Sequence, residues 1–320
     1  MSTPWRASLA LVLVATLFGC GQLNASWQDD TLAASTRADP AEAVEEELAT
    51  DDVSPRWGYV GEYGPLTWGS ASERWKLCDD GREQSPVDLS KSTRYEPGKF
   101  GFAVGAPAEQ RIAMSYHPTA YTAVDTGQYL RFEFADAGSI VIDGDPYALE
   151  ELRFHTPSEH SLGGTRYRAE YQLVHRNGRG GVAIVAVLVQ GGPDHMALGP
   201  ALAALPGVGE QRIGAVLLDP ADLVPLNWTM VRYDGSLAEP PCTEKVRWHV
   251  MLNPLTMSSS QIETLAGRFP DSARPVQNLN GRPLVVEIDV LSGLAKADSD
   301  QELLPEAAPP TAATEPKKIS

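Results

Sequence analysis

The chain has 320 residues, of which 42 are acidic and 26 basic, and its formal net charge is −16 at neutral pH. A chain this acidic does not fit a nucleic-acid-binding protein, because such proteins use clustered Lys and Arg side chains to neutralise phosphates. The length is sufficient for a domain that buries its own hydrophobic core.

The N-terminus has the pattern of a bacterial processing signal. Arg6 precedes an apolar run over residues 7–19, which ends in Leu-Phe-Gly-Cys at Cys20. This run is shorter than the roughly 20 residues of a membrane-spanning helix, and a positive start before an apolar stretch is typical of a secretory signal. We predict a lipoprotein signal peptide over 1–19, a lipid anchor on Cys20 and a location at the bacterial cell envelope, at the outer membrane with the domain in the periplasm or at the cell surface. An ordinary signal peptide with an incidental Cys20 is the alternative.

Residues 20–55 are predicted to form an acidic linker. The stretch from 22 to 55 contains nine acidic side chains and one basic side chain, a net charge of −8 that is half of the chain total. Such a self-repelling spacer is solvated and extended. The acidity of the chain is therefore largely a property of the linker and does not indicate a cationic substrate.

Residues 56–291 are predicted to form a single, predominantly β domain. Short runs in which apolar and polar residues alternate are typical of strands, and they recur at 129–134, 139–142, 182–189, 246–252 and 284–288. We expect an antiparallel-dominated, twisted sheet with short peripheral helices. The tail over 292–320, which is rich in Ala, Pro and charged residues, is predicted to be disordered.

One pair of predicted strands brings polar side chains together. Arg153 and His155 stand two residues apart, so they point to the same face of a strand. After the Gly163-Gly164 turn, Glu170 and Gln172 alternate in the same way on a second strand, which is expected to pair antiparallel with the first. Two side chains from one strand and one from its neighbour are how a sheet builds a three-ligand metal site.

Several motifs resemble the α-class carbonic anhydrases. They are R-F-H-T-P-S-E-H at 153–160, E-Y-Q-L-V-H at 170–175, W-G-Y-V-G-E-Y-G-P-L-T-W-G at 57–69 and C-x-x-G-x-x-Q-S-P-V-D-L at 78–89. In that family three histidines hold a zinc ion. The resemblance places them at Arg153, His155 and Gln172, so two of the three ligands are replaced, while Glu170 retains its place behind the third ligand.

The resemblance also implies losses beyond the metal ligands. A family threonine orients the zinc-bound hydroxide and hydrogen-bonds a glutamate; Ala238 stands at the threonine and Glu159 at the glutamate. Glu239 replaces the threonine that follows. Gln128 stands where the family has its proton-shuttle histidine, and an amide cannot carry a proton at neutral pH.

Two cysteines remain once Cys20 is assigned to lipid. These are Cys78 and Cys242. An even number of cysteines in an oxidising compartment is typical of disulfide-bonded proteins. Bacterial α-carbonic anhydrases commonly pair cysteines at these two motifs, so the resemblance implies a Cys78–Cys242 disulfide. Two free buried thiols are the alternative.

The replaced ligands conflict with the activity that the family implies. A guanidinium remains protonated and offers only donors, and an amide oxygen is a weak zinc ligand. We predict that Arg153 occupies the place of the ion and pairs with Glu151, Glu239 or both, with Gln172 and Glu170 beside it.

We therefore expect a carbonic-anhydrase-related envelope protein without zinc, other cofactors or carbon dioxide hydration. It would be a binding or scaffold module for an unidentified protein or small-molecule ligand, and would meet the membrane only through its lipid anchor. One alternative is an active zinc carbonic anhydrase. Another is a different acid-base enzyme in the same cleft that uses Glu151, His155, Glu159 or Glu239.

Overall fold

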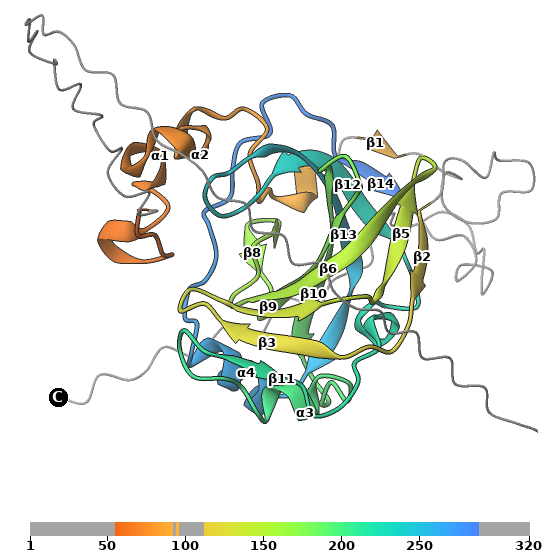
Figure 1. Ribbon diagram of the computed structural model, residues 1–320. Helices are drawn as coiled ribbons and strands as arrows, with labels where there is room; N and C mark the ends of the chain where they lie inside the picture. Colours follow the sequence, from red (N-terminus) through yellow and green to blue (C-terminus); the bar gives the residue numbers. More distant parts are fainter. Residues whose placement is uncertain (1–54, 92–93, 96–111, 288–320) are drawn as a thin grey trace, which may run out of the picture. The chain divides into compact units, whose positions relative to one another are not determined.

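The computed structural model describes residues 55–91, 94–95 and 112–287 (Figure 1). The predicted signal peptide, the anchor residue Cys20, the acidic linker up to residue 54 and the tail from residue 292 lie outside these ranges. Within the described ranges, none of the helices has the length and apolar character needed to span a bilayer.

A twisted sheet of twelve strands forms the body of the described domain. Its strand order is β1-β14-β12-β13-β10-β9-β6-β4-β3-β11, and β5 pairs with both β2 and β6. The β1–β14 and β10–β13 pairs are parallel and the other pairs are antiparallel, which confirms the expected antiparallel-dominated sheet. The strands are β1 (Arg94–Tyr95), β2 (Ala113–Tyr116), β3 (Tyr121–Asp125), β4 (Leu130–Phe134), β5 (Gly138–Ile142), β6 (Asp145–His155), β9 (Ala169–Arg176), β10 (Val182–Gly191), β11 (Gln211–Ile213), β12 (Met230–Ser236), β13 (Glu244–Met257) and β14 (Val285–Glu287).

The remaining elements are short and peripheral. A two-stranded sheet consists of β7 (Ser161–Leu162) and β8 (Thr165–Arg166). The longest described helix is α4, which starts with a capping box in which the Ser258 and Gln261 side chains bond each other's backbone N–H. The helices are η1 (Gly61–Tyr63), α1 (Trp68–Ala71), η2 (Glu73–Trp75), α2 (Leu77–Asp80), η3 (Leu89–Lys91), α3 (Gly199–Leu202), η5 (Pro220–Leu223) and α4 (Ser259–Ala266).

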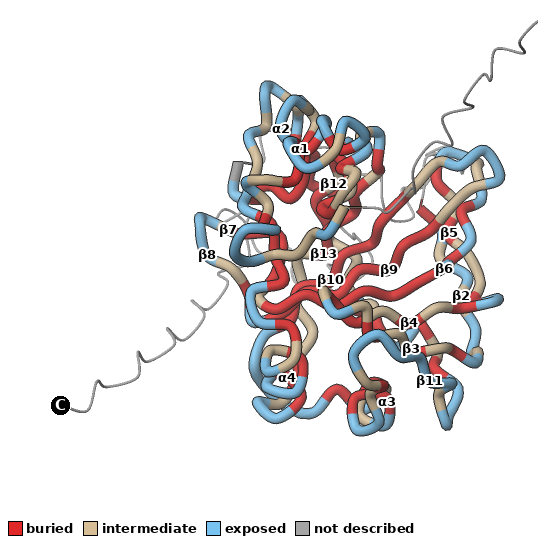
Figure 2. The backbone as a smooth tube through the Cα atoms, turned by 60° about the vertical axis from the view of Figure 1, so that its left-hand side comes forward, coloured by how far each residue is buried: buried red, intermediate tan, exposed pale blue. Residues whose placement is uncertain are grey.

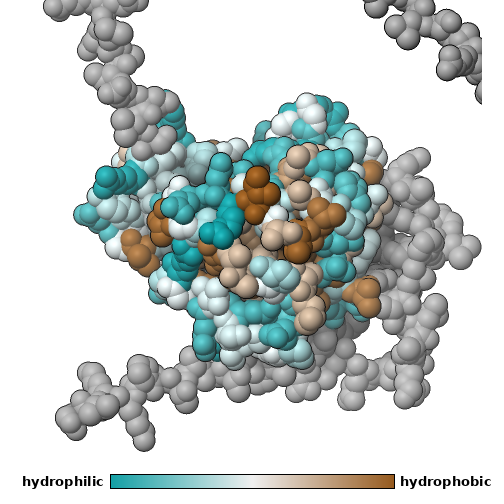
Figure 3. Space-filling view, turned by 60° about the horizontal axis from the view of Figure 1, so that its bottom comes forward, coloured by the Kyte–Doolittle hydropathy of each residue, from teal (hydrophilic) through white to brown (hydrophobic). Residues whose placement is uncertain are grey.

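Strands β9 and β10 are buried along most of their length (Figure 2), and the sheet buries apolar side chains on both faces. Leu152, Leu173 and Val185 stand opposite one another on β6, β9 and β10, and they belong to the larger apolar cluster. Val174 and Ile184 point to the other face and belong to a second cluster. Strands buried on both faces read as nearly continuous apolar runs, as Val-Ala-Ile-Val-Ala-Val-Leu-Val of β10 does. On the side of α3, α4 and β11, apolar surface residues are scattered among hydrophilic ones (Figure 3).

A disulfide ties the N-terminal segment to the loop after β12. The Cα atoms of Cys78 and Cys242 are 5.0 Å apart and the two sulfur atoms are bonded, which confirms the expected disulfide. Trp68 and Trp75 pack against it in a small separate cluster. The loop that carries Ala238 and Glu239 is therefore held against the aromatic residues of the N-terminal segment.

Candidate functional site

The predicted site residues lie on neighbouring strands and share one face of the sheet. Arg153 on β6 is opposite Gln172 on β9, and His155 is opposite Glu170. All four side chains are buried. The antiparallel pairing inferred from the alternation is confirmed, and the side chains at the family's three zinc positions are brought together.

Arg153 is held by two carboxylates. Its Nε donates to Oε1 of Glu151 at 3.0 Å and its Nη2 donates to the same oxygen, while Nη1 donates to Oε1 of Glu239. The Tyr129 ring lies against the guanidinium, with 5.6 Å from the Arg153 Cζ to the ring centroid. Burial would lower the pKa of Arg153, but Glu239, Tyr129 and Glu151 raise it well above its usual value. The cation is therefore permanent, and both predicted carboxylate partners are present.

The ion pairs continue toward the surface along β4. Arg131 lies 2.7 Å from Glu133 and 3.8 Å from Glu151, measured between nitrogen and oxygen. We call the series Glu133, Arg131, Glu151, Arg153 and Glu239 the ion-pair chain. Its three carboxylates and two guanidiniums alternate in sign, so it carries a net charge of −1.

Gln172 donates to a carboxylate. Its Nε2 donates to Oε1 of Glu170 at 2.9 Å. Oε2 of Glu170 accepts the backbone N–H of His160 at 2.9 Å, and Oε1 lies 3.0 Å from Nδ1 of the His160 ring. Burial opposes ionisation of Glu170, yet these contacts hold its pKa below the usual value. The His160 ring is bonded at its other nitrogen to Tyr233 at 2.7 Å, as expected of a structural histidine rather than a ligand.

His155 is a neutral imidazole. Its Nδ1 donates to the backbone carbonyl of Ser272 at 2.7 Å, so the lone pair is on Nε2. Burial lowers the pKa of the ring. Among the described residues Nε2 has no hydrogen-bond partner. The rings of Tyr59 and Tyr129 pack around it, with centroids at 6.1 Å and 5.8 Å.

Glu159 is buried, and its two carboxyl oxygens have different surroundings. Its Oε2 accepts the backbone N–H of Arg274 at 3.0 Å, whereas Oε1 has no hydrogen-bond partner within the described ranges. Ala238 is buried and its methyl group cannot donate. Burial, then Glu170, raises the pKa of Glu159 well above its usual value. The contact at 3.4 Å between Glu159 Oε1 and His155 Nδ1 therefore joins two groups whose charged forms burial disfavours.

Gln128 serves a structural contact. It lies in the turn between β3 and β4, and its Nε2 donates to the backbone carbonyl of Trp57 at 3.3 Å. The residue after it, Tyr129, was not singled out by the sequence reasoning. The side chain of Tyr129 points inward and covers both Arg153 and His155. Its place at the start of the alternating run of β4 was the available indication.

The residues at the three family positions do not fit a zinc ion. Metal ligands must be neutral imidazoles or anions, and the buried guanidinium of Arg153 stands at the first position. The amide of Gln172 is engaged as a donor to Glu170. His155 is the one imidazole of the three, and a single imidazole does not make a zinc site.

Comparisons with known proteins agree with the fold and show the family. Residues 63–288 match the family model of eukaryotic-type carbonic anhydrases. The chain is 34% identical over 235 residues to a carbonic anhydrase of Klebsiella pneumoniae, covering 72% of this chain and 90% of the relative. Among solved structures it is similar to the α-carbonic anhydrase of Photobacterium profundum, with 33% identity and a TM-score of 0.65 over 72% of this chain and all of the other. It is also similar to dioscorin, solved in a complex with ascorbate, with 27% identity and a TM-score of 0.64 over 73% and 98% of the two chains.

Proposed function

The chain belongs to the eukaryotic-type, or α-class, carbonic anhydrase family, and we propose that it is a zinc-free member that works as a binding or scaffold protein. The family's hydration of carbon dioxide depends on a zinc ion that lowers the pKa of its bound water to about 7. The proposal is that this chain has exchanged that ion for a buried arginine and no longer performs the reaction.

The observation that carries the proposal is the paired guanidinium of Arg153. Two unit charges of the same sign 4 Å apart repel by about 4 kcal/mol at the effective dielectric constant of a protein site, and a divalent ion would roughly double this repulsion. Arg153 cannot lose its proton to relieve it, and Glu151 and Glu239 hold it in place. One of the ligands that a zinc ion would need is therefore replaced by an opposing charge, and a second by a neutral amide.

The groups that assist the reaction in the family are altered as well. Ala238 offers no hydroxyl to orient a hydroxide, and Gln128 cannot relay a proton. Glu151 and Glu239 are engaged with Arg153, which disfavours them as acid-base groups for a different reaction. This combination favours a structural use of the cleft over a catalytic one.

The rest of the domain is consistent with a folded protein that binds a partner or ligand. The sheet, the disulfide and the two apolar clusters are intact. Dioscorin, whose solved complex contains ascorbate, is an example of this fold with a small-molecule ligand. We further propose that the chain is tethered to the cell envelope through lipid on Cys20, which would place this binding domain close to a membrane.

Elemental analysis tests the proposal. The purified full chain would be dialysed against a weak chelator, and its zinc content and carbon dioxide hydration measured beside those of the Klebsiella pneumoniae relative treated identically. We expect far less than one zinc per chain and hydration at the background rate. One tightly held zinc per chain, or hydration comparable to that of the relative, would overturn the proposal.

A further inference from the structure

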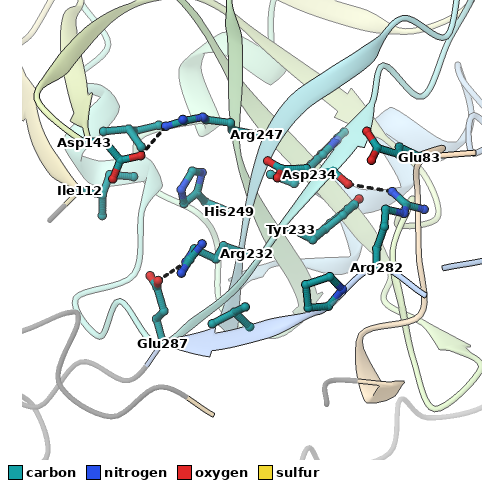
Figure 4. Close-up of a pocket in the computed structure, with 14 residues that line it drawn as sticks. Glu83, Ile112, Asp143, Arg232, Tyr233, Asp234, Arg247, His249, Arg282 and Glu287 are labelled. Atoms are coloured by element: carbon teal, nitrogen blue, oxygen red, sulfur yellow. Dashed lines mark hydrogen bonds and ion pairs between the residues drawn. The ribbon is translucent and has the colours of Figure 1, made fainter. Parts of the chain in front are cut away.

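A hollow around His249 lies beside β12, β13 and β14 (Figure 4). His249 on β13 is opposite Val185, which is opposite Leu173 and then Leu152, so His249 points away from the ion-pair chain. The hollow has a volume of about 440 Å³ and is bordered by β12, β13, β14, the turn after β5 and the loop before β14. It is independent of the metal positions and of the function proposed for them.

The floor of the hollow contains an unused polar atom. His249 is 4% exposed, and within the described ranges its Nδ1 has no hydrogen-bond partner. Burial, followed by the charges of Arg232 and Arg247, lowers the pKa of the ring to about 4. The ring is thus neutral at neutral pH, and in its Nε2-protonated tautomer Nδ1 is an acceptor. A buried polar atom without a partner costs free energy, so a ligand that donates to it is favoured.

The guanidiniums around the hollow already have partners. Arg247 lies 2.8 Å from Asp143, and Arg232 pairs with Glu287. Arg282 donates to the backbone carbonyls of Asp234 and Gln84, and lies over the Tyr233 ring. The positive charge of each guanidinium is thus already partly compensated by a carboxylate or by backbone carbonyl groups, which weakens the attraction of the hollow for an anion.

The acidic side chains are in excess. The lining contains four carboxylates and three guanidiniums. In the described structure, the carboxylates of Glu83 and Asp234 form no ion pair within 4.0 Å and no hydrogen bond, and that of Asp234 points into the hollow (Figure 4). Apolar side chains complete the wall, namely Ile112, Ile142, Pro283 and Val285. The hollow thus combines unbalanced negative charge, a buried acceptor and an apolar surface.

We propose that this hollow binds a small organic cation. The ligand would carry a primary ammonium group attached to an apolar body. The ammonium N–H groups would donate to the carboxylate of Asp234 and to Nδ1 of His249, and the apolar body would lie against Ile142 and Val285. Charge-assisted hydrogen bonds are the stronger ones, so the ammonium group supplies most of the selectivity.

Three matched probes test this inference: benzylammonium, benzyl alcohol and benzoate. The full chain, labelled with ¹³C in its six histidines, would be titrated with each probe, and the His249 ring signals identified from a His249→Gln variant. We expect benzylammonium to shift the His249 signals saturably with one site per chain. Benzyl alcohol and benzoate should bind at least about tenfold more weakly, which corresponds to about 1.4 kcal/mol.

Two variants locate the interaction. Asp234→Asn should weaken benzylammonium binding at least about tenfold, whereas Glu263→Gln, an exposed carboxylate on α4, should leave it unchanged. The inference is overturned if benzoate binds as tightly as benzylammonium, if Asp234→Asn has no effect, or if no probe moves the His249 signals. None of these outcomes depends on zinc content, so they are separate from the test of the proposed function.

Discussion

Replacing Arg153 with Met would leave two buried carboxylates without their shared cation. The Arg153 side chain is 6% exposed, and those of Glu151 and Glu239 are 12% and 7% exposed, so solvent screens the cluster little. Removing one partner of a buried ion pair typically costs about 3–5 kcal/mol. Glu151 keeps a contact with Arg131 at 3.8 Å, whereas Glu239 keeps no other ion pair within the described residues. We therefore expect Arg153→Met to lower the free energy of unfolding by about 4 kcal/mol.

Glu239→Gln should cost less, about 1–2 kcal/mol, because the amide oxygen still accepts from Arg153 and Glu151 still neutralises it. The double variant Arg153→Met/Glu239→Gln should be more stable than the sum of the two losses predicts, by about 1–3 kcal/mol. The measurement is urea unfolding followed by tryptophan fluorescence. In a domain of this size Arg153→Met should lower Tm by roughly 8–16 °C.

A matched control lies on the neighbouring strand. Arg176 pairs with Glu150 at 2.8 Å, but both side chains are more than one third exposed. Such surface pairs contribute about 0–1 kcal/mol, so Arg176→Met should be nearly neutral. The reasoning is refuted if Glu239→Gln costs as much as Arg153→Met, or if the two losses add within about 0.5 kcal/mol, since either result would mean that the cluster is not coupled.

Three further outcomes are expected. An Arg153→His/Gln172→His variant should take up zinc at micromolar concentration and hydrate carbon dioxide weakly; a folded variant that takes up none would show that the cleft has remodelled. Burial lowers the pKa of His175 to about 3 and of His249 to about 4, so below about pH 6.5 the unfolded chain binds the extra protons and stability falls as the pH drops. In urea unfolding between pH 6 and 4, His249→Gln should reduce that slope by about 1 kcal/mol per pH unit, and an unchanged slope would contradict the assignment. Reduction of the Cys78 disulfide, which closes a loop with a sequence separation of 164 residues, should lower the free energy of unfolding by about 5 kcal/mol in the chain-entropy model; an equal denaturation midpoint with and without reductant would argue against this.

The sequence was sufficient for the centre of the site. Alternation along β6 and β9 placed Arg153 and Gln172 on one face, and a buried cation needs a carboxylate, which pointed to Glu151 and Glu239. In the structure Arg153 contacts both Glu151 and Glu239, and it stands opposite Gln172 on the neighbouring strand. The reasoning succeeded because a strand period of two fixes the face of each residue once the pairing is known.

Features built from distant segments were not predicted. Arg131 joins the ion-pair chain because β4 pairs with β6, and the sequence does not show that neighbour relation. The parallel pairing of β10 with β13 likewise follows from the whole sheet order. The hollow around His249 is formed by residues from six separate segments, and no motif in the sequence indicates that they meet. The positions of the lipid anchor and of the linker lie outside the described residues and remain predictions.

The ion-pair chain also constrains how this protein could evolve. Its carboxylates compensate Arg153, so a single change back to His at this position would leave Glu151 and Glu239 buried without their cation and without enough ligands for a metal. A change of Glu239 alone would instead leave the arginine undercompensated. Each of these two single changes therefore passes through a less stable intermediate. Under the function proposed above, the exchange of a histidine for Arg153 is therefore difficult to reverse, and descendants of this chain would acquire new roles more readily than they would gain a zinc site.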